Sequence, residues 1–386
     1  MAGGEGPGVR GTRWFSICNP PSPPAPLPPP ISVSRDALSY RAGGEGSIKA
    51  SSFAAKVRCQ DNTNMHNGFI QELTRWGPQA QYGAVSRSQA LAYCARLART
   101  HYENFSVATL LLPRRLLPHF HAIYAYCRWA DDLGDETGGG QHALDLLRWW
   151  REELLRTYDG RPRHPVMIAL EDTISRFHIP PTPFLELLMA FEQDQVVKRY
   201  DTYEQVLGYC RYSANPVGHL VLYLCESFND DTAKLSNSIC TGLQLANFWQ
   251  DVSRDLDIGR VYLPAEDRRC FGYADADLEA RRFTPAFAEL MRFEVDRARR
   301  HFEVGLPLVR LMPSDVQSDI ELFARGGLSI LRKIEEAGYD VWRARPVLRK
   351  WDKLTLVGGV FLRGWVRRFW HAPPQPQPLP PGGTTP

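Results

Sequence analysis

The sequence of 386 residues predicts an all-α fold, for three reasons. Hydrophobic side chains recur every three to four residues in one segment after another, which is the spacing of one face of an α-helix. Proline and glycine interrupt the pattern between segments, whereas the alternation typical of strands and any internal repeat are absent from the sequence. Hydrophobic types make up 44% of the chain, which is enough to bury a large core.

Ten helices are predicted, each bounded by residues that start or stop a helix. In order, the predicted helices cover residues 86–102, 118–134, 141–158, 163–177, 183–198, 203–227, 233–256, 284–303, 316–337 and 347–370. The breakers that separate them are Pro113, Pro118, Gly138 to Gly140, Pro180, Pro181, Pro264, Pro285 and Pro346.

The two ends of the chain differ in composition from the middle. Residues 20–30 contain eight prolines, and residues 1–70 are predicted to form a disordered leader rich in proline and glycine. Met65 lies where ordered-looking sequence begins, so Met1 is interpreted as a mis-assigned start. Residues 75–370 are predicted to form one helical domain, and residues 371–386, with seven prolines, a disordered tail.

Charge and cysteine content exclude several classes of protein. The net charge of +3 comes from residues 1–64, which hold seven Lys or Arg and four Asp or Glu, so the sequence carries no nucleic-acid footprint. The eight cysteines form no C-x-x-C pair, which favours free thiols in a reducing cytoplasm. No apolar run approaches the 18 residues typical of a spanning helix.

Two pairs of aspartates are the candidate chemical site. Asp131 and Asp135 are four residues apart, as are Asp251 and Asp255, so each pair shares one helix face. The first pair continues a stripe of residues that otherwise has an inward-facing pattern, and the second pair continues a polar stripe that apolar residues flank. Both patterns indicate a cavity. The alternative is a solvated surface, where such like charges cost only about 0.2–0.5 kcal/mol. Carboxylates in a cavity need compensation, and Mg²⁺ held by carboxylates and phosphate oxygens supplies it.

Five motifs that follow in order resemble the squalene/phytoene synthase family. They are His101-Tyr-Glu-Asn-Phe105, Tyr124-x-x-x-Arg128-x-x-Asp131-Asp-x-x-Asp135, Tyr209-Cys, Gln244-x-x-Asn247-x-x-x-Asp251-x-x-x-Asp255 and Arg260-x-Tyr262-Leu-Pro264. The resemblance implies a single-domain isoprenoid-synthase-type helical bundle with a central cavity. Within the family, the sequences around Tyr102 and Tyr209 are most similar to bacterial hydroxysqualene synthases of the hopanoid pathway.

The resemblance also implies roles for single residues. The metal ligands for Mg²⁺ would be Asp131, Asp135, Asp251 and Asp255, with Asp132 a weaker candidate because it points off the face. The substrate-binding residues would be His101, Arg128, Gln244, Asn247, Arg260 and Tyr262, and the catalytic residues Phe105, Tyr124, Tyr209 and Asn215. The arginines would bind a diphosphate through charge-assisted hydrogen bonds, and the aromatic rings would stabilise a cation. Trp249 is a further aromatic candidate, although core packing is favoured for it.

The sequence departs from the family pattern at two places. Gln250 and Arg254 stand where many members have Arg and Glu, which puts the number and position of metal ions at the second motif in doubt. Asn215-Pro216 replaces a pair of small residues common in two-step synthases. Proline inside a helix kinks it, which either reshapes the pocket to admit an ordered water or has no catalytic meaning.

The C-terminal segment 347–370 is amphipathic. Its basic residues fall within a narrow arc, with Trp351 and further apolar residues opposite, which is typical either of a helix in a membrane surface or of one packed on a core. The predicted location is therefore the cytoplasm, with peripheral contact at the inner membrane face as one alternative.

Three functions follow from the resemblance. The first is a Mg²⁺-dependent lyase that converts presqualene diphosphate and water to hydroxysqualene and diphosphate. The second is a head-to-head transferase that makes squalene or phytoene from two prenyl diphosphates. The third is a non-catalytic assembly protein of the same fold, which the retained acidic clusters argue against. No G-x-G-x-x-G for a nicotinamide cofactor follows a strand in the sequence.

Removal of residues 1–64 is expected to leave a soluble and fully active protein, because the leader offers little apolar surface to pack. The measurement is a comparison of the full chain with a chain that begins at Met65, by thermal melting and by turnover. A melting temperature several degrees lower, or aggregation of the shorter chain, would show that the leader is part of the fold.

Overall fold

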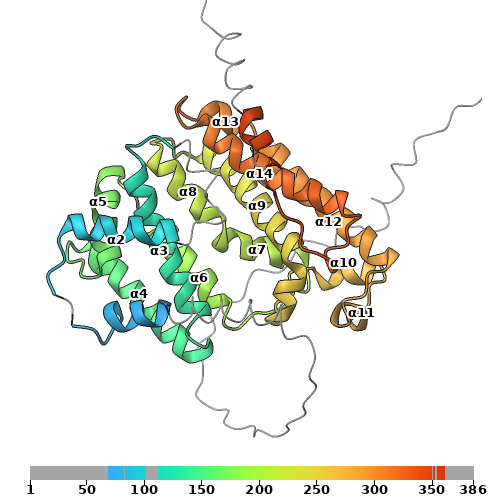
Figure 1. Ribbon diagram of the computed structural model, residues 1–386, viewed down its shortest axis with the longest axis horizontal. Helices are drawn as coiled ribbons and strands as arrows, with labels where there is room; N and C mark the ends of the chain where they lie inside the picture. Colours follow the sequence, from blue (N-terminus) through green and yellow to red (C-terminus); the bar gives the residue numbers. More distant parts are fainter. Residues whose placement is uncertain (1–67, 82, 101–111, 350, 353, 361–386) are drawn as a thin grey trace, which may run out of the picture. The chain divides into compact units, whose positions relative to one another are not determined.

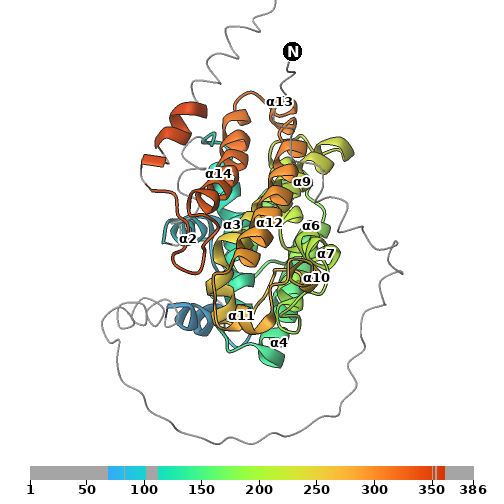
Figure 2. The same ribbon diagram turned by 90° about the vertical axis from the view of Figure 1, so that its right-hand side faces the viewer.

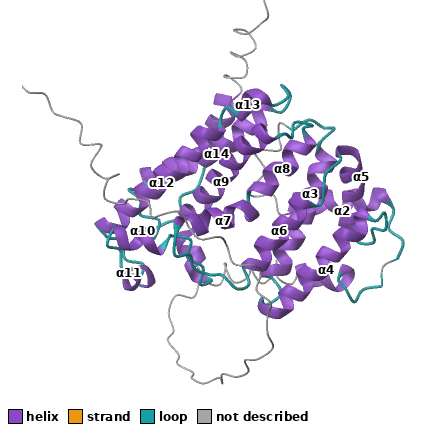
Figure 3. Ribbon diagram, turned by 180° about the vertical axis from the view of Figure 1, so that it is seen from behind, coloured by secondary structure: helices purple, strands orange, loops and turns teal. Residues whose placement is uncertain are grey.

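The computed structural model describes residues 68–81, 83–100, 112–349, 351, 352 and 354–360. Helices account for most of them, and Figure 3 shows no strand in this part of the chain. An isolated bridge joins Arg199 to Val261. The predicted all-α class is confirmed.

The helices of the described residues follow the predicted segments closely (Figure 1). They are α2 (Arg87–Thr100), α3 (Leu117–Asp135), α4 (Gly140–Tyr158), α5 (Pro165–Phe177), α6 (Thr182–Gln193), α7 (Tyr203–Ser213), α8 (Asn215–Leu224), α9 (Asp230–Asp257), α10 (Ala265–Cys270), α11 (Asp275–Glu279), α12 (Pro285–Gly305), α13 (Leu308–Leu311) and α14 (Gln317–Glu336). Residues 68–76, 351, 352 and 354–360 are also helical. The short helices α10, α11 and α13 and the helical residues 68–76 were not predicted. None of the described helices is long and apolar enough to cross a membrane.

Helix α9 is the centre of one group of helices. It packs against α7, α8, α12, α13 and α14, and both Figure 1 and Figure 2 show α9, α12 and α14 side by side. The contact with α8 is close, since a Cβ added at Gly218 would lie 2.3 Å from the hydroxyl oxygen of Ser236. The apolar face of α9, which includes Leu245 and Trp249, is buried, and this fixes the direction in which its polar stripe points.

Helix α3 is held by aromatic packing on one side. It packs against α2, α4, α5 and α6, and the ring of Trp129 stacks on Trp150 with centroids 5.3 Å apart. Trp129 and Leu133 are buried, with 1% and 0% of their surfaces exposed. Because residues 128, 131 and 135 occupy another face of the helix, this packing turns Asp131 and Asp135 away from the core.

The single helix predicted over residues 203–227 is wrong in one respect, because the chain breaks at Ala214. Ala214 has φ −124° and ψ −47°, and α8 begins directly after it with Pro216 in its first turn. Proline lacks the N–H that an α-helix needs at that point and is tolerated only in a first turn. The predicted proline effect is therefore a complete break between α7 and α8.

Candidate active site

The first acidic cluster lies at the C-terminal end of α3. Nη1 of Arg128 donates to Oδ2 of Asp131 at 3.3 Å, and its Nε donates to Oδ2 of Asp132 at 3.0 Å. Asp132 is 5% exposed, and burial raises the pKa of its carboxyl to about 7. As expected for a residue off the polar face, Asp132 serves inside the protein as the partner of Arg128.

The second acidic cluster lies on the last turns of α9. Along its stripe Gln244 is half-buried, Asn247 is exposed, Asp251 is buried and Asp255 is half-buried. An exposed asparagine in the middle of a helix that five others surround indicates that the stripe faces open space rather than a neighbouring helix. The predicted polar face of α9 is therefore present.

Arg260 joins the two clusters. Its Nη2 donates to Oδ1 of Asp135 at 2.8 Å, although the two residues are 125 positions apart in the chain. The turn after α9 places it there: Gly259 adopts a φ of +76°, and the backbone N–H of Arg260 donates to the carbonyl of Asp255 at 2.7 Å. Glycine suits this left-handed position because it has no Cβ. Arg260 thus connects the end of α9 to the end of α3.

A further carboxylate, which was not predicted from the sequence, acts on both clusters. Asp194 follows α6 directly, is 7% exposed and accepts a hydrogen bond from the hydroxyl of Tyr209 at 2.8 Å. Burial raises the pKa of Asp194 to about 6, against the attraction of Arg260. No acidic partner at helical spacing marks Asp194 in the sequence, and the helix around it was predicted to continue to residue 198.

The carboxylates of the two clusters act electrostatically on one another. Burial raises the pKa of Asp131 to about 6, with the charges of Asp135 and Asp194 adding to the rise. Burial likewise raises the pKa of Asp255 to about 7, and Asp251 and Asp194 add to it. The Asp131 side chain is nevertheless 44% exposed. Asp194 acts on both Asp131 and Asp255, so the two clusters face one region, which solvent reaches at Asp131 and which we call the recess.

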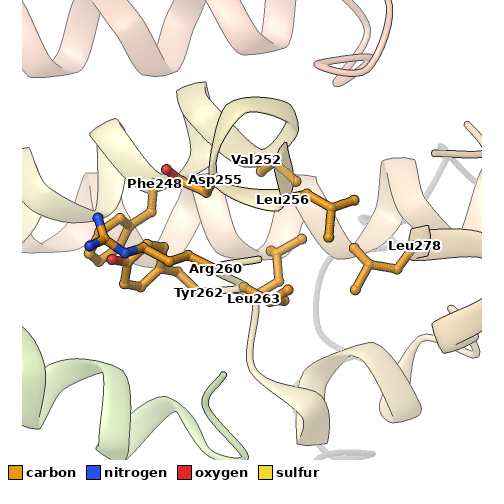
Figure 4. Close-up of a pocket in the computed structure, with 9 residues that line it drawn as sticks. Phe248, Val252, Asp255, Leu256, Arg260, Tyr262, Leu263 and Leu278 are labelled. Atoms are coloured by element: carbon orange, nitrogen blue, oxygen red, sulfur yellow. The ribbon is translucent and has the colours of Figure 1, made fainter. Parts of the chain in front are cut away.

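A cluster of buried aromatic rings packs beside this region. Phe248 and Tyr262 stack with centroids 3.7 Å apart and planes 7° from parallel, and Tyr209 lies 5.6 Å from Tyr262. Figure 4 shows Arg260 and Tyr262 side by side below the turns of α9 that carry Phe248 and Asp255, in a pocket that these residues line. Charged and aromatic groups therefore meet at one place.

The other predicted residues are placed as follows. Tyr124 is half-buried one turn before Arg128, and burial raises the pKa of its hydroxyl, with Asp131 and Asp132 among the charges that act on it. Trp249 is buried and donates to the carbonyl of Glu294, so the core role favoured for it is confirmed. His101 and Phe105 lie outside the described residues.

Asn215 is separate from the acidic clusters. Its side chain is 9% exposed and accepts a hydrogen bond from Thr241 on α9 at 3.1 Å. Ten residues of helix, about 15 Å, separate Thr241 from Asp251. No contact of the described residues links Asn215 to Asp131 or Asp255, so any role it has concerns a different part of a bound molecule.

The carboxylates fit a metal ion only when a substrate phosphate completes its coordination. No three acidic, histidine or cysteine side chains of the described residues come together as a ready-made metal site. Asp131, Asp135 and Asp251 are instead paired with arginines. Mg²⁺ commonly takes one or two carboxylates and completes its shell with water and substrate phosphates. The residues present therefore fit a Mg²⁺ that arrives with a diphosphate, and they do not form a cage for a metal alone.

The buried charge of Asp194 leads to a prediction about pH. In Asp194→Asn, the free energy of unfolding is expected to lose the pH-dependent contribution of the Asp194 carboxyl. Because folding raises the pKa of Asp194 from 3.8 to about 6, its contribution to stability is full below about pH 4 and is lost as the pH rises through about 6. Two pKa units correspond to about 3 kcal/mol. The unfolding free energy of Asp194→Asn should therefore rise by up to this amount, relative to wild type, between about pH 4 and 7.

Denaturant titrations across this pH range measure the effect. Asp159→Asn is the matched control, because Asp159 is exposed and far from the recess in sequence. A constant difference between Asp194→Asn and wild type at all pH values would contradict a raised pKa for Asp194.

Comparison with known proteins points to one family. The family model described as squalene/phytoene synthase matches residues 98–352. The chain is 32% identical to a phytoene synthase from Thermus thermophilus, over 74% of this chain and 95% of the relative, and 29% identical to one from Arthrospira platensis, over 73% and 96%.

Similarity to two solved structures indicates the same family. The crystal structure of squalene synthase HpnC from Alicyclobacillus acidocaldarius is 43% identical, covers 67% of this chain and 97% of its own, and superposes with a TM-score of 0.64. A dehydrosqualene synthase in complex with a ligand is 26% identical, with coverages of 72% and 97% and a TM-score of 0.67. The predicted isoprenoid-synthase-type bundle is thereby confirmed. The chain belongs to the squalene/phytoene synthase family.

Proposed function

We propose that this protein is a hydroxysqualene-forming lyase, which converts presqualene diphosphate and water to hydroxysqualene and diphosphate. The observation that carries the proposal is the recess in which Arg260 links Asp135 of the first acidic cluster to the second cluster, beside the stacked rings of Phe248 and Tyr262. A diphosphate needs cations and arginines, and the carbocation left by its departure needs a surface of neutral rings.

The charged side of the recess is proposed to bind and activate the diphosphate. Arg128 and Arg260 would turn their guanidinium groups from carboxylates to phosphate oxygens, and Asp131, Asp135 and Asp255 would share Mg²⁺ with the same oxygens. Bound there, Mg²⁺ neutralises the charge that develops on the leaving diphosphate. The clustered carboxylates support this role, because raised pKa values for Asp131 and Asp255 mark groups that lack a full counter-charge in the protein alone.

The aromatic side is proposed to hold the carbocation. Burial raises the pKa of Tyr209 and Tyr262 well above the usual value for tyrosine, so both phenols stay protonated and their rings neutral. The hydroxyl of Tyr209 is engaged by Asp194, which keeps the oxygen occupied and the ring in place. Each suitably placed ring contributes about 0.5–2 kcal/mol to the stability of a nearby cation.

Two features support capture of the cation by water. Asn215 is a buried polar side chain on the face of α8 that meets α9, and of the described residues only Thr241 hydrogen-bonds to it. An amide with donors to spare is suited to orienting a water beside the hydrocarbon part of the substrate. The similarity at 43% identity to a protein named for squalene, not phytoene, supports a substrate of the same carbon skeleton.

A complete head-to-head transferase is the second candidate, and the relatives named phytoene synthase favour it. The experiment that separates the two supplies the purified full-length protein with farnesyl diphosphate, geranylgeranyl diphosphate or presqualene diphosphate in Mg²⁺ buffer, with and without NADPH as the hydride donor that squalene formation requires, and identifies products by mass spectrometry. Hydroxysqualene from presqualene diphosphate alone is the expected result. Squalene or phytoene from two prenyl diphosphates would establish the transferase, and no product from any of the three would leave only the non-catalytic assembly role.

Peripheral membrane contact stays a prediction. The described residues of the amphipathic segment include Trp351 and Leu354, which are 79% and 61% exposed. The remainder of its apolar and basic arcs, from residue 361 onward, lies outside the described residues. Exposed apolar side chains at this end are compatible with a substrate that is itself drawn from lipid.

A further inference from the structure

The chain between α6 and α7, residues 194–202, touches both sides of the recess, and we call it the α6–α7 connection. Its backbone pairs with the segment that carries Arg260. The N–H of Val261 donates to the carbonyl of Lys198 at 2.7 Å, beside the isolated bridge described above. The connection therefore fixes the course of the segment that follows α9.

Gln195 ties the same connection to α3. Its Nε2 donates to the carbonyl of Gly134 at 3.3 Å and to the carbonyl of Phe191 at 3.2 Å. Gly134 lies in the last turn of α3 and Phe191 in the last turn of α6, and these two helices pack against each other. The last carbonyls of a helix have no partner inside it, and an amide carries two N–H donors. One side chain therefore binds the ends of two helices.

Gly134 leaves the space that this contact needs. Glycine is among the least favourable residues inside a helix, so its place in α3 needs a reason. A Cβ added at Gly134 would lie 3.2 Å from Nε2 of Gln195, although the two residues are 61 positions apart. Without a Cβ, the amide reaches the carbonyl of Gly134 directly. The glycine and the glutamine are therefore matched to each other.

The contact lies beside two carboxylates of the recess. Asp135 follows Gly134 directly, and Asp194 directly precedes Gln195. Asp135 in turn accepts the hydrogen bond from Arg260 at 2.8 Å. Because the α6–α7 connection binds both the end of α3 and the segment that carries Arg260, one piece of chain sets the separation of these two groups.

We propose that Gln195 is a positioning residue for the diphosphate site. Through the carbonyl of Gly134 it holds the end of α3, and with it Asp135, at the separation from Arg260 that a diphosphate with its Mg²⁺ requires. Gln195 acts through the backbone and does not bind the diphosphate itself. This inference rests on the proposed function, because it assumes that a diphosphate enters the recess.

The first test removes the donors of Gln195 and keeps the length of its side chain. Calorimetry measures the affinity of full-length Gln195→Met for inorganic diphosphate at a fixed Mg²⁺ concentration. We expect a loss of about tenfold, because a small displacement of Asp135 from Arg260 spoils the alignment of both with the phosphates. Gln141→Met is the matched control, since the amide of Gln141 donates to Asp145 on the exposed surface of α4. Wild-type affinity in Gln195→Met would overturn the inference.

The second test separates positioning from a contribution to stability alone. In Gly134→Ala, the new Cβ displaces the flexible amide of Gln195, while alanine favours the helix more than glycine does. We expect the melting temperature to stay equal or rise and the affinity for inorganic diphosphate to fall about as far as in Gln195→Met. A merely structural contact would lower both quantities together. Unchanged affinity, or affinity and melting temperature that fall in parallel, would overturn the inference.

The third test asks whether the two substitutions act through one contact. The double variant Gly134→Ala with Gln195→Met is expected to lose no more affinity than the weaker-binding single variant, because either change already breaks the contact. Losses that multiply in the double variant would show two separate effects and overturn the inference. Failure of the wild type to bind inorganic diphosphate with Mg²⁺ would remove the proposed function. Wild-type binding with any contrary result above would remove this inference alone.

Discussion

Asp131→Asn and Asp255→Asn are each expected to abolish turnover while the protein stays folded. Both substitutions keep the shape of the side chain and remove a charge that the proposed Mg²⁺–diphosphate complex needs. Loss of one electrostatic contact to a developing charge typically costs a factor of about 10²–10³ in rate, and loss of a metal ligand costs at least that. Stability should be unchanged or higher, because burial already raises the pKa of both carboxyls and so disfavours their charged forms in the folded state.

Single-turnover rates with presqualene diphosphate, together with thermal melts, check this prediction. Asp231→Asn is the matched control on the same helix as Asp255, because its side chain is 88% exposed at the start of α9. Wild-type rates from either variant in Mg²⁺ buffer would remove that residue from the proposed site. A loss of folding in Asp131→Asn would instead show that the charge pair with Arg128 holds the bundle together.

The long helices and the two acidic faces could be predicted from the sequence because both depend on local periodicity. A stripe such as Gln244, Asn247, Asp251 shares a face whatever surrounds it. The same reasoning placed Asp132 off the face, and the structure pairs it with Arg128. The break at Ala214 was seen only as a kink, since the sequence shows where proline stands but not whether the helix resumes on a new axis.

Contacts between residues far apart in the sequence could not be predicted from local periodicity. Asp194 has no acidic neighbour at helical spacing, and it enters the site because α6 ends beside Tyr209 and Arg260. Arg345 lies 94 residues from Asp251 and sits in a loop whose course depends on Trp342 packing against α12. In both cases the deciding event is tertiary packing, which places a charge where no sequence pattern indicates one.

The fate of the carbocation gives the largest expected difference between the two candidate enzymes. The protein is expected to consume presqualene diphosphate without any nicotinamide cofactor and to release an alcohol whose oxygen comes from solvent. In the proposed order, diphosphate leaves first towards Arg260, and a positioned water then adds to the rearranged cation and gives up a proton. A Mg²⁺ held by Asp131, Asp135 and Asp255 would supply further positive charge to the leaving group. We expect the stacked rings of Phe248 and Tyr262 to hold the cation meanwhile, because neutral rings stabilise it without bonding to it.

Turnover in ¹⁸O-labelled water, with and without NADPH, measures this outcome by the mass of the product. Incorporation of one label per alcohol at equal rates in both arms is expected. Asn215→Leu is the informative variant: it keeps the size of the side chain near Thr241 but removes the polar group, so it should lower the yield of alcohol more than the rate at which diphosphate is released. If the alcohol lacks the label, or if turnover requires NADPH and yields a hydrocarbon, water is not the group that captures the cation. The head-to-head transferase then becomes the better assignment, because a reductant rather than a positioned water would complete the reaction in the same recess.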